Sequence, residues 1–313
     1  MKPVTACCES IDDVLSDLLR PLSSDLADAF ADTPTPLPLR DDHIAFFDRP
    51  LPDLGESSTR VVILVGPDAT GAQSALHALA EHLGAPVANT WGAKGIYPWD
   101  DPHHIGTCGL QRDDFSLLGF GEFDIVLMLG IDDLEAKPDR STCRRIEETH
   151  PSALDQLRSA STRRPMVSQP NQLYTRMAAI AQPGYVDDSF PRHPARAVMD
   201  LKQSLGPGTR VTAQPGLAGL WIARTFPTDR MGSVIVPAVD RPGIGAAVGL
   251  ASAAQGTDTV GVVQGPVDDV TAEVMRVAHH HELALRLEVW ADDVDWTRTD
   301  DLIAAAGPVV AWT

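Results

Sequence analysis

Short apolar runs alternate with segments of helical periodicity along most of the chain, and this alternation limits the folds open to it. The first run, VVILV at 61–65, is apolar at every position and ends at Gly66. Such a run is typical of a strand that is covered on both faces, as in parallel sheets. A helix is expected over 72–83, a second strand over 85–88 and a third over 123–130. Strands that alternate with helices of this length predict parallel sheets with right-handed crossovers.

The same alternation resumes after Pro194. The expected helices cover 196–205, 217–226, 243–254, 269–281 and 300–306, and the expected strands cover 209–213, 233–237, 259–263, 284–290 and 308–311. Residues 140–193 are rich in Arg, Ser, Pro and Gln, and we expect helices and a connecting crossover there. The sequence therefore predicts an α/β fold of two parallel-sheet, three-layer domains.

The region before the first strand has a different character. Apolar residues recur at helical spacing over 10–30, which predicts an amphipathic helix. Residues 33–38 read Thr-Pro-Thr-Pro-Leu-Pro, and an extended linker is expected because each proline moves the residue before it out of the helical region. The predicted organisation is a helix and linker over 1–58, a Rossmann-like domain over 59–185 and a second domain over 186–313.

The formal net charge of −18 restricts the partners of the chain. A surface this negative repels phosphate backbones and anionic membranes, so neither nucleic-acid nor membrane binding is expected. No apolar stretch reaches the ~18 residues that cross a bilayer, and the first residues lack the pattern of a signal peptide. The cysteines, Cys7, Cys8, Cys108 and Cys143, show no paired zinc spacing. We expect a cytoplasmic protein with reduced thiols.

The segment 60–133 contains several short motifs in a specific order. They are the strand that ends at Gly66, the helix with Leu79-Ala80-Glu81, Ala85-Pro86-Val87 with Thr90, Lys94-Gly95, Asp101-Pro102-His103 with Gly106, and Asp124-Ile125-Val126-Leu127 before Gly130. Through these motifs the segment resembles the central domain of thiamine-diphosphate-dependent enzymes of the acetolactate synthase kind. In that family the central domain holds flavin in some members, an adenine nucleotide in others and nothing in many. FAD or an adenine nucleotide is therefore the cofactor that the resemblance implies for this domain.

The residue types at these positions are compatible with a nucleotide-type ligand. A glycine directly after a buried strand lets the backbone approach a ligand closely, and the helix that follows offers unpaired N–H groups. The alternative is that Gly66 and Gly71 only form a turn and a helix cap. Asp132 belongs to an acidic pair just past a predicted strand end, where open parallel sheets bind ligands. The candidate ligand-binding residues of this domain are Gly66, Gly71, Thr90, Lys94, Gly95, His103 and Asp132.

The second domain resembles a shortened form of the diphosphate-binding domain of the same family. The similar segments are Phe190-Pro191 with 194–205, Gly216 through Arg224, and the glycine- and alanine-rich run 242–251. Within that run, Gly243 and Gly245 are candidate cofactor contacts. Small residues of this kind also allow a helix to pack closely on a strand, and this alternative stays open.

The resemblance implies a magnesium motif that this chain has altered. The family uses a Gly-Asp-Gly motif and a later asparagine, whose oxygens are hard ligands suited to Mg²⁺. Here Gly265 keeps the first glycine, and Pro266 takes the place of the aspartate. Asp268 could replace it only in a rebuilt loop, and Asp292 lies near the asparagine position. Gly265 is a candidate cofactor contact, and Asp268 and Asp292 are candidate metal ligands.

Two further departures bear on function. Residues 1–58 are too few for the pyrimidine-binding domain, whose glutamate activates thiamine in this family, and the lid segment over the cofactor is missing. Thiamine diphosphate and magnesium are therefore not expected in the isolated chain, and no catalytic residue can be assigned.

Three hypotheses follow. The first is a degenerate acetolactate synthase-like protein, non-catalytic alone, that binds a nucleotide-type ligand or a protein partner. The second is one subunit of a split 2-oxo acid decarboxylase or carboligase, with the pyrimidine-binding domain on another chain. The third is an enzyme that uses the old cleft for unrelated chemistry. In the first two cases we expect a homo-oligomer or a partner subunit.

Overall fold

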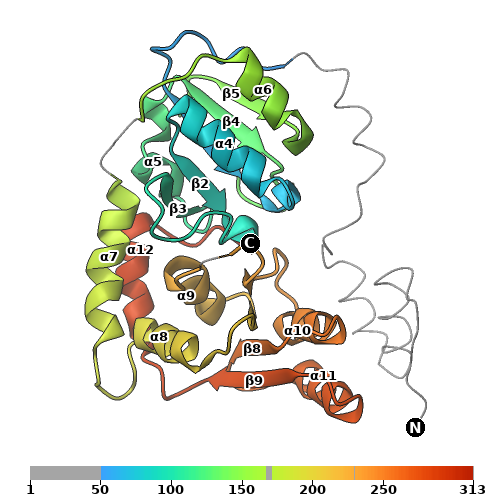
Figure 1. Cartoon of the computed structure of the whole chain (residues 1–313). Helices are drawn as coiled ribbons and strands as arrows, with labels where there is room; N and C mark the ends of the chain where they lie inside the picture. Colours follow the sequence, from blue (N-terminus) through green and yellow to red (C-terminus); the bar gives the residue numbers. More distant parts are fainter. Residues whose placement is uncertain (1–50, 167–170, 229, 313) are drawn as a thin grey trace, which may run out of the picture.

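The computed structural model describes residues 51–166, 171–228 and 230–312. Two purely parallel sheets organise these residues, one of five strands and one of four (Figure 1). The α/β class and the parallel pairing predicted from the sequence are thus confirmed. The helix expected over 10–30 and the linker at 33–38 lie outside the described residues.

The first sheet has the strand order β3-β2-β1-β4-β5. Its strands are β1 (Val61–Val65), β2 (Val87–Thr90), β3 (His104–Cys108), β4 (Ile125–Leu129) and β5 (Ile146–Thr149). Every residue of the central strands β1 and β4 is buried. Along β1, Val62 and Leu64 enter one apolar cluster while Ile63 and Val65 enter another, because successive side chains point to opposite faces.

Helices cover the faces of this sheet. Helix α4 (Gln73–Leu83) packs against α6 (Leu154–Ala160), and the short α5 (Asp114–Leu117) follows β3. Helix α4 ends at Gly84, whose φ of 56° lies in the left-handed region that glycine adopts without strain. Five 3₁₀ turns complete the described chain: η1 (Pro67–Ala69), η2 (Trp91–Ala93), η3 (Phe120–Glu122), η4 (Pro151–Ala153) and η5 (Trp296–Arg298).

The second sheet has the order β7-β6-β8-β9. Its strands are β6 (Arg210–Ala213), β7 (Val234–Ile235), β8 (Thr259–Gln264) and β9 (Leu285–Trp290). The helices of this half are α7 (Gln172–Tyr185), α8 (Pro194–Ser204), α9 (Leu217–Thr225), α10 (Ile244–Ala254), α11 (Asp269–His280) and α12 (Thr299–Ala306). One apolar cluster joins α10 and α11 to the sheet, and another contains α8, α9 and α12, so the sheet is covered on both faces.

Three expectations about secondary structure were wrong. The sequence reading missed β3 and β5, which are edge strands and only partly buried, so they lack a continuous apolar run. The strand expected over 308–311 does not form. Instead Val309 makes a single antiparallel bridge to Gln111, beside the first sheet. Proline at 308 has no N–H for a sheet ladder.

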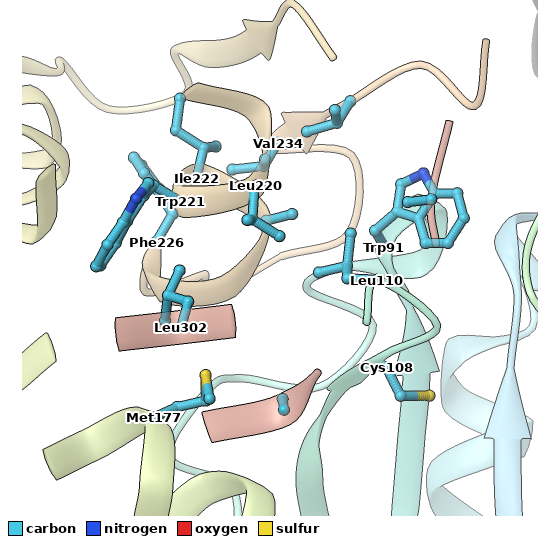
Figure 2. Packing of buried hydrophobic residues seen from close by; sticks show 14 of the residues in the cluster. Trp91, Cys108, Leu110, Met177, Leu220, Trp221, Ile222, Phe226, Val234 and Leu302 are labelled. Carbon is cyan, nitrogen blue, oxygen red and sulfur yellow. The ribbon is translucent and has the colours of Figure 1, made fainter. Parts of the chain in front are cut away.

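A shared apolar core joins the two halves of the molecule. Figure 2 shows Trp91, Cys108 and Leu110 of the first half in the same cluster as Leu220 and Trp221 of α9. The predicted domain boundary at 185/186 stays a prediction. Helix α7, which lies before it, packs against α8 and α12, which lie after it. Among the described residues, no helix is long and apolar enough to span a membrane.

Candidate functional site

The first sheet has its topological switch point between β1 and β4, because the chain winds away from β1 in both directions. Ligands of open α/β sheets bind outside the carboxyl ends of the strands at such a point. Here the two loops contact each other. Gly66 N donates to Leu129 O at 2.8 Å, and a Cβ on Gly66 would overlap the backbone of Gly130. Gly66 is therefore required by the loop contact, and protein backbone fills the space beside it.

This loop contact predicts a measurable cost for a side chain at Gly66. A Gly66→Ala substitution should lower the free energy of unfolding by about 1–3 kcal/mol, the usual cost of overpacking, because the methyl meets backbone that cannot rotate away. Gly206→Ala is the matched control, since its Cβ would meet nothing closer than Thr209 Oγ1 at 3.6 Å. The control should be unchanged or up to about 1 kcal/mol more stable. Urea denaturation measures both, and equal midpoints for the two variants would contradict the loop contact.

The backbone next to this contact is accessible at the start of α4. Gly71 has a φ of 85°, and no atom of the described residues lies within 4 Å of its Cβ position. Ala72, the N-cap residue, makes no side-chain cap to the helix. Asp132 follows β4, and its Oδ1 accepts from Leu134 N at 2.8 Å, so this carboxylate shapes its own turn. Of the candidate glycines in this half, Gly71 is the one with open space beside it.

Three candidates at the end of β2 and on the segment that follows it contact protein. The hydroxyl of Thr90 donates to Val65 O at 3.4 Å, and His103 Nδ1 lies 3.0 Å from Ala85 O. Gly95 has a φ of 88°, and a Cβ there would overlap the carbonyl of Arg230. This glycine therefore lets the first half approach the second closely. Each of the three positions has a structural role in this fold.

Lys94, the fourth candidate on this segment, differs from the others. It follows η2 and is only 5% exposed. Within the described part of the chain, its ammonium has neither a carboxylate partner nor a hydrogen-bond acceptor. Burial, together with the nearby charge of Arg224, lowers the pKa of Lys94 to about 7. Near neutral pH a large share of this side chain is therefore the uncharged amine.

His104 lies beside this lysine. Its Nε2 is 2.7 Å from Asn89 Oδ1, and both side chains are held between β2 and β3. Burial and the charge of Lys94 lower the pKa of His104 to about 4. The imidazole is consequently neutral over the physiological range, and it supplies no counter-charge to the lysine.

Glu135 is a buried carboxyl group that the sequence reading missed. It is 5% exposed, and its Oε1 accepts from Gly92 N at 2.7 Å. Its Oε2 has no hydrogen-bond partner among the described residues. Burial, with smaller contributions from Asp132 and Asp68, raises the pKa of Glu135 to about 7, against the opposing effect of Thr90 and Gly92. In sequence it follows the acidic pair 132–133 closely, which made a solvated face the simplest interpretation.

Arg224 of α9 forms a polar contact between the two halves that the sequence reading also missed. Its side chain is 1% exposed and forms an ion pair with Asp114, which is fully buried. Its Nη1 donates to Thr107 O at 2.8 Å and its Nε donates to Gln111 Oε1 at 3.1 Å. A buried arginine at the end of an otherwise apolar helix is a sequence signal that could have identified it.

Asp114 and Gln111 extend this contact. Asp114 Oδ2 accepts from Leu110 N at 2.9 Å and from Gln111 N at 3.0 Å. The Gln111 amide donates to Leu302 O at 2.9 Å and to Gly307 O at 2.7 Å, at the end of α12. The turn after β3 is thereby tied to both α9 and α12.

The second sheet has its topological switch point between β6 and β8, because the chain winds away from β6 in both directions. Gln214 directly follows β6 at this point. Its Oε1 accepts from Gly245 N at 3.0 Å, and its Nε2 donates to Arg241 O at 2.8 Å. Gly243 N donates to Asp268 Oδ2 at 3.2 Å. A helix N-terminus at this place binds anions in many α/β proteins. Here side chains of the protein already accept from two N–H groups at the start of α10.

The two candidate metal ligands, Asp268 and Asp292, share no hydrogen-bond partner among the described residues. Asp268 caps α11, because its Oδ1 accepts from Thr271 N at 2.7 Å. Asp292 is exposed, and Gly265 N donates to Trp290 O at 2.8 Å. In the described ranges, no group of three His, Cys, Asp or Glu residues could hold a metal ion. A cation site at Asp268 and Asp292 stays a prediction without support from this geometry.

The candidates thus fall into two groups at the carboxyl ends of two different sheets. Thr90, Lys94 and Gly95 lie at the end of β2 and just after it, with Lys94 near Arg224 and Gly95 against Arg230. Gly66, Gly71 and Asp132 follow β1 and β4, on either side of the switch point of the first sheet. The switch point of the second sheet, between β6 and β8, is surrounded by Gly243, Gly245, Gly265 and Asp268. In the first group Lys94 is a buried side chain with a lowered pKa, whereas in the second group Gly243 N donates to Asp268 and Gly245 N donates to Gln214.

Comparison with known proteins finds a family match for one segment of the chain. Residues 54–153 match the family model described as the central domain of thiamine pyrophosphate enzymes. A relative from Pseudomonas amyloderamosa, described as an uncharacterized 42.6 kDa protein in the isoamylase 3′ region, is 34% identical over 82 residues. That alignment covers 26% of this chain and 21% of the relative. The matched family segment contains the whole first sheet with Lys94 and Glu135.

Proposed function

We infer that this protein is a degenerate acetolactate synthase-like protein. It performs no thiamine chemistry alone and acts with a protein partner. The match of residues 54–153 to the central domain of thiamine pyrophosphate enzymes supports this proposal. The observation that carries this proposal is the hydrogen bonding at the switch point of the second sheet, between β6 and β8. There the protein's own side chains already accept from the backbone N–H groups that a magnesium diphosphate would need.

Magnesium diphosphate does not fit the residues present. Pro266 offers no side-chain oxygen where the family has an aspartate. Both oxygens of Asp268 already accept hydrogen bonds, from Thr271 N at 2.7 Å and from Gly243 N at 3.2 Å. Mg²⁺ requires a near-octahedral set of oxygen ligands, and this loop presents no such set. A diphosphate would also have to displace Gln214 from Gly245 N.

A protein partner is supported by exposed apolar side chains between α7 and α8. Phe190 is 79% exposed and Val186 is 76% exposed. Both belong to the segment that connects α7 to α8, and large exposed apolar side chains are a feature of interaction sites when they form a patch. The partner is a second copy of this chain or a different subunit, and the split decarboxylase or carboligase is the case in which that subunit supplies a pyrimidine-binding domain.

Titration calorimetry of the purified protein with Mg²⁺ and thiamine diphosphate tests the proposal. We expect no saturable heat at millimolar cofactor. The Gln214→Ala variant, which frees Gly245 N, is the informative comparison, because weak diphosphate binding in this variant alone would identify Gln214 as the excluding group. Stoichiometric binding of the cofactor by the wild-type protein would overturn the proposal. Native mass spectrometry of the same sample reports a homo-oligomer or a retained partner.

A nucleotide-type ligand in the central domain is the second candidate function. The open backbone at Gly71 and the uncapped start of α4 favour it, because unpaired N–H groups at a helix N-terminus bind phosphate. The contact between Gly66 and Gly130 restricts such a ligand to the outer side of that helix start. Denaturing analysis of the protein purified without added cofactor tests this candidate, since FAD or an adenine nucleotide would be released from it.

A further inference from the structure

Lys94 is buried, unlike most lysines, which are exposed to solvent. It follows β2 at the carboxyl edge of the first sheet, where ligands of parallel sheets bind. The second half of the molecule covers this segment. Trp99 N donates to Thr228 O at 2.9 Å, and Gly95 packs directly on the carbonyl of Arg230. The lysine is therefore enclosed between the two halves and is 5% exposed.

The groups around Lys94 do not neutralise it. Arg224 faces it from α9 and His104 faces it from β3. The guanidinium of Arg224 is itself paired with Asp114, so that carboxylate is already engaged by another cation. A buried ammonium without a partner is costly, and burial beside another cation favours the neutral amine. Desolvation and a neighbouring cation are the two features that activate nucleophilic lysines in enzymes.

We propose that Lys94 is a nucleophilic amine that forms an imine with a small aldehyde or ketone at the carboxyl edge of the first sheet. This activity goes beyond the proposed function, because it needs no thiamine, no metal and no partner subunit. It also makes use of a side chain that the packing of the two halves does not explain.

The chemistry balances without an added oxidant or reductant. The lone pair of neutral Nζ attacks the carbonyl carbon, and the π pair of the C=O bond moves to oxygen. A proton passes from nitrogen to that oxygen to give a carbinolamine. Loss of the hydroxyl with a second nitrogen proton, as water, leaves the C=N bond. The same sequence in reverse releases the carbonyl compound.

The surroundings favour a small carbonyl compound without a carboxylate. The charge of Arg224 is already balanced by Asp114, and its Nε and Nη1 donate to Gln111 and Thr107, so it offers a carboxylate no uncompensated cation. The low exposure of Lys94 excludes a bulky ligand. A short aldehyde or ketone meets both conditions.

Reductive trapping tests this proposal in the intact protein. The protein is incubated with acetaldehyde and cyanoborohydride, a hydride donor that converts an imine to a stable secondary amine, and each lysine is quantified by peptide mass spectrometry. We expect Lys94 to be labelled at least about tenfold faster at pH 7.5 than the internal controls Lys137 and Lys202, because only the neutral amine attacks a carbonyl and burial lowers the pKa of Lys94 to about 7. Lys137 pairs with Asp133 and Lys202 lies over the ring of Phe226.

The pH profile distinguishes a reactive site from accidental labelling. The rate at Lys94 should rise through pH ~7 and then level off, and a pH profile at Lys94 that matches those at Lys137 and Lys202 would contradict the proposal. Lys94→Arg should lose the fast-labelled peptide, and the wild-type map decides the question even if this variant does not fold. Labelling of Lys94 only in urea, or more slowly than Lys137 in the native protein, would overturn the proposal.

Discussion

Replacing Arg224 with methionine should lower the free energy of unfolding by about 3–5 kcal/mol. The substitution keeps an apolar side chain of similar length but leaves the carboxylate of Asp114 fully buried with no counter-charge. Burial already raises the pKa of Asp114, and Arg224 opposes that shift. Loss of the cation therefore leaves a desolvated negative charge that the native state can relieve only by taking up a proton. Urea denaturation at pH 7 measures the effect.

Two further variants isolate the charge from the packing. In the Arg224→Met background, Asp114→Asn removes the uncompensated charge but keeps an oxygen that can accept from Leu110 N and Gln111 N. This double variant should recover part of the lost stability. Arg112→Met is the matched control, because its ion pair with Asp113 is solvent-exposed. Such pairs contribute about 0–1 kcal/mol. Equal effects of Arg224→Met and Arg112→Met would contradict a dominant role for burial.

The sequence predicted the fold best where strands are buried on both faces. The all-apolar runs of β1 and β4 leave little choice of structure, and each lies in the centre of the first sheet. Edge strands carry no such pattern. In β5 the residues Ile146, Glu147 and Glu148 are all at least partly exposed, so their sequence resembles that of a loop. Strand pairing at an edge depends on the neighbour, β4, rather than on the strand's own residues.

The sequence led to candidate residues, but it did not reveal the contacts that they make. Lys94 and Thr90 were identified through a resemblance, and both lie at the carboxyl edge of the first sheet. The pairing of Glu135 with Gly92 joins residues 43 positions apart, and no local pattern reveals it. The same holds for Gln214, which accepts from Gly245 N, 31 positions away in the sequence. Gly66 was predicted to let the backbone approach a ligand, and in the structure the neighbour that approaches it is the protein's own backbone.

Glu135 should make the stability of the protein decrease as pH rises from about 4.5 to 7. Its pKa is raised from 4.5 to about 7, so within this window the native state holds a proton that the unfolded chain has released. Stability falls with pH wherever the native state binds more protons. At 1.36 kcal/mol per pH unit, the full window corresponds to about 3 kcal/mol. The contribution is complete below pH 4.5 and lost above pH 7.

Glu135→Gln removes this proton exchange, and it is the measurement that isolates it. Glutamine keeps an oxygen to accept from Gly92 N, so the loop contact survives. The difference in unfolding free energy between variant and wild type should grow by about 3 kcal/mol in favour of the variant from pH 4.5 to 7. The control is Glu122→Gln, an exposed glutamate on η3, and an equal trend in both variants would contradict a special role for the burial of Glu135.

The neighbouring titrating groups do not obscure this comparison. His104, whose pKa is lowered to about 4, makes stability rise with pH between 4 and 6.5, which opposes the trend of Glu135 in the wild-type curve. Lys94 acts in the same direction as His104 but only above pH 7, since its pKa is lowered to that value. Both groups are present in both proteins and cancel in the difference. A difference that stays flat across the window would therefore mean that Asp68, Asp132 and burial do not hold the proton on Glu135, and that the carboxylate is charged in the folded protein.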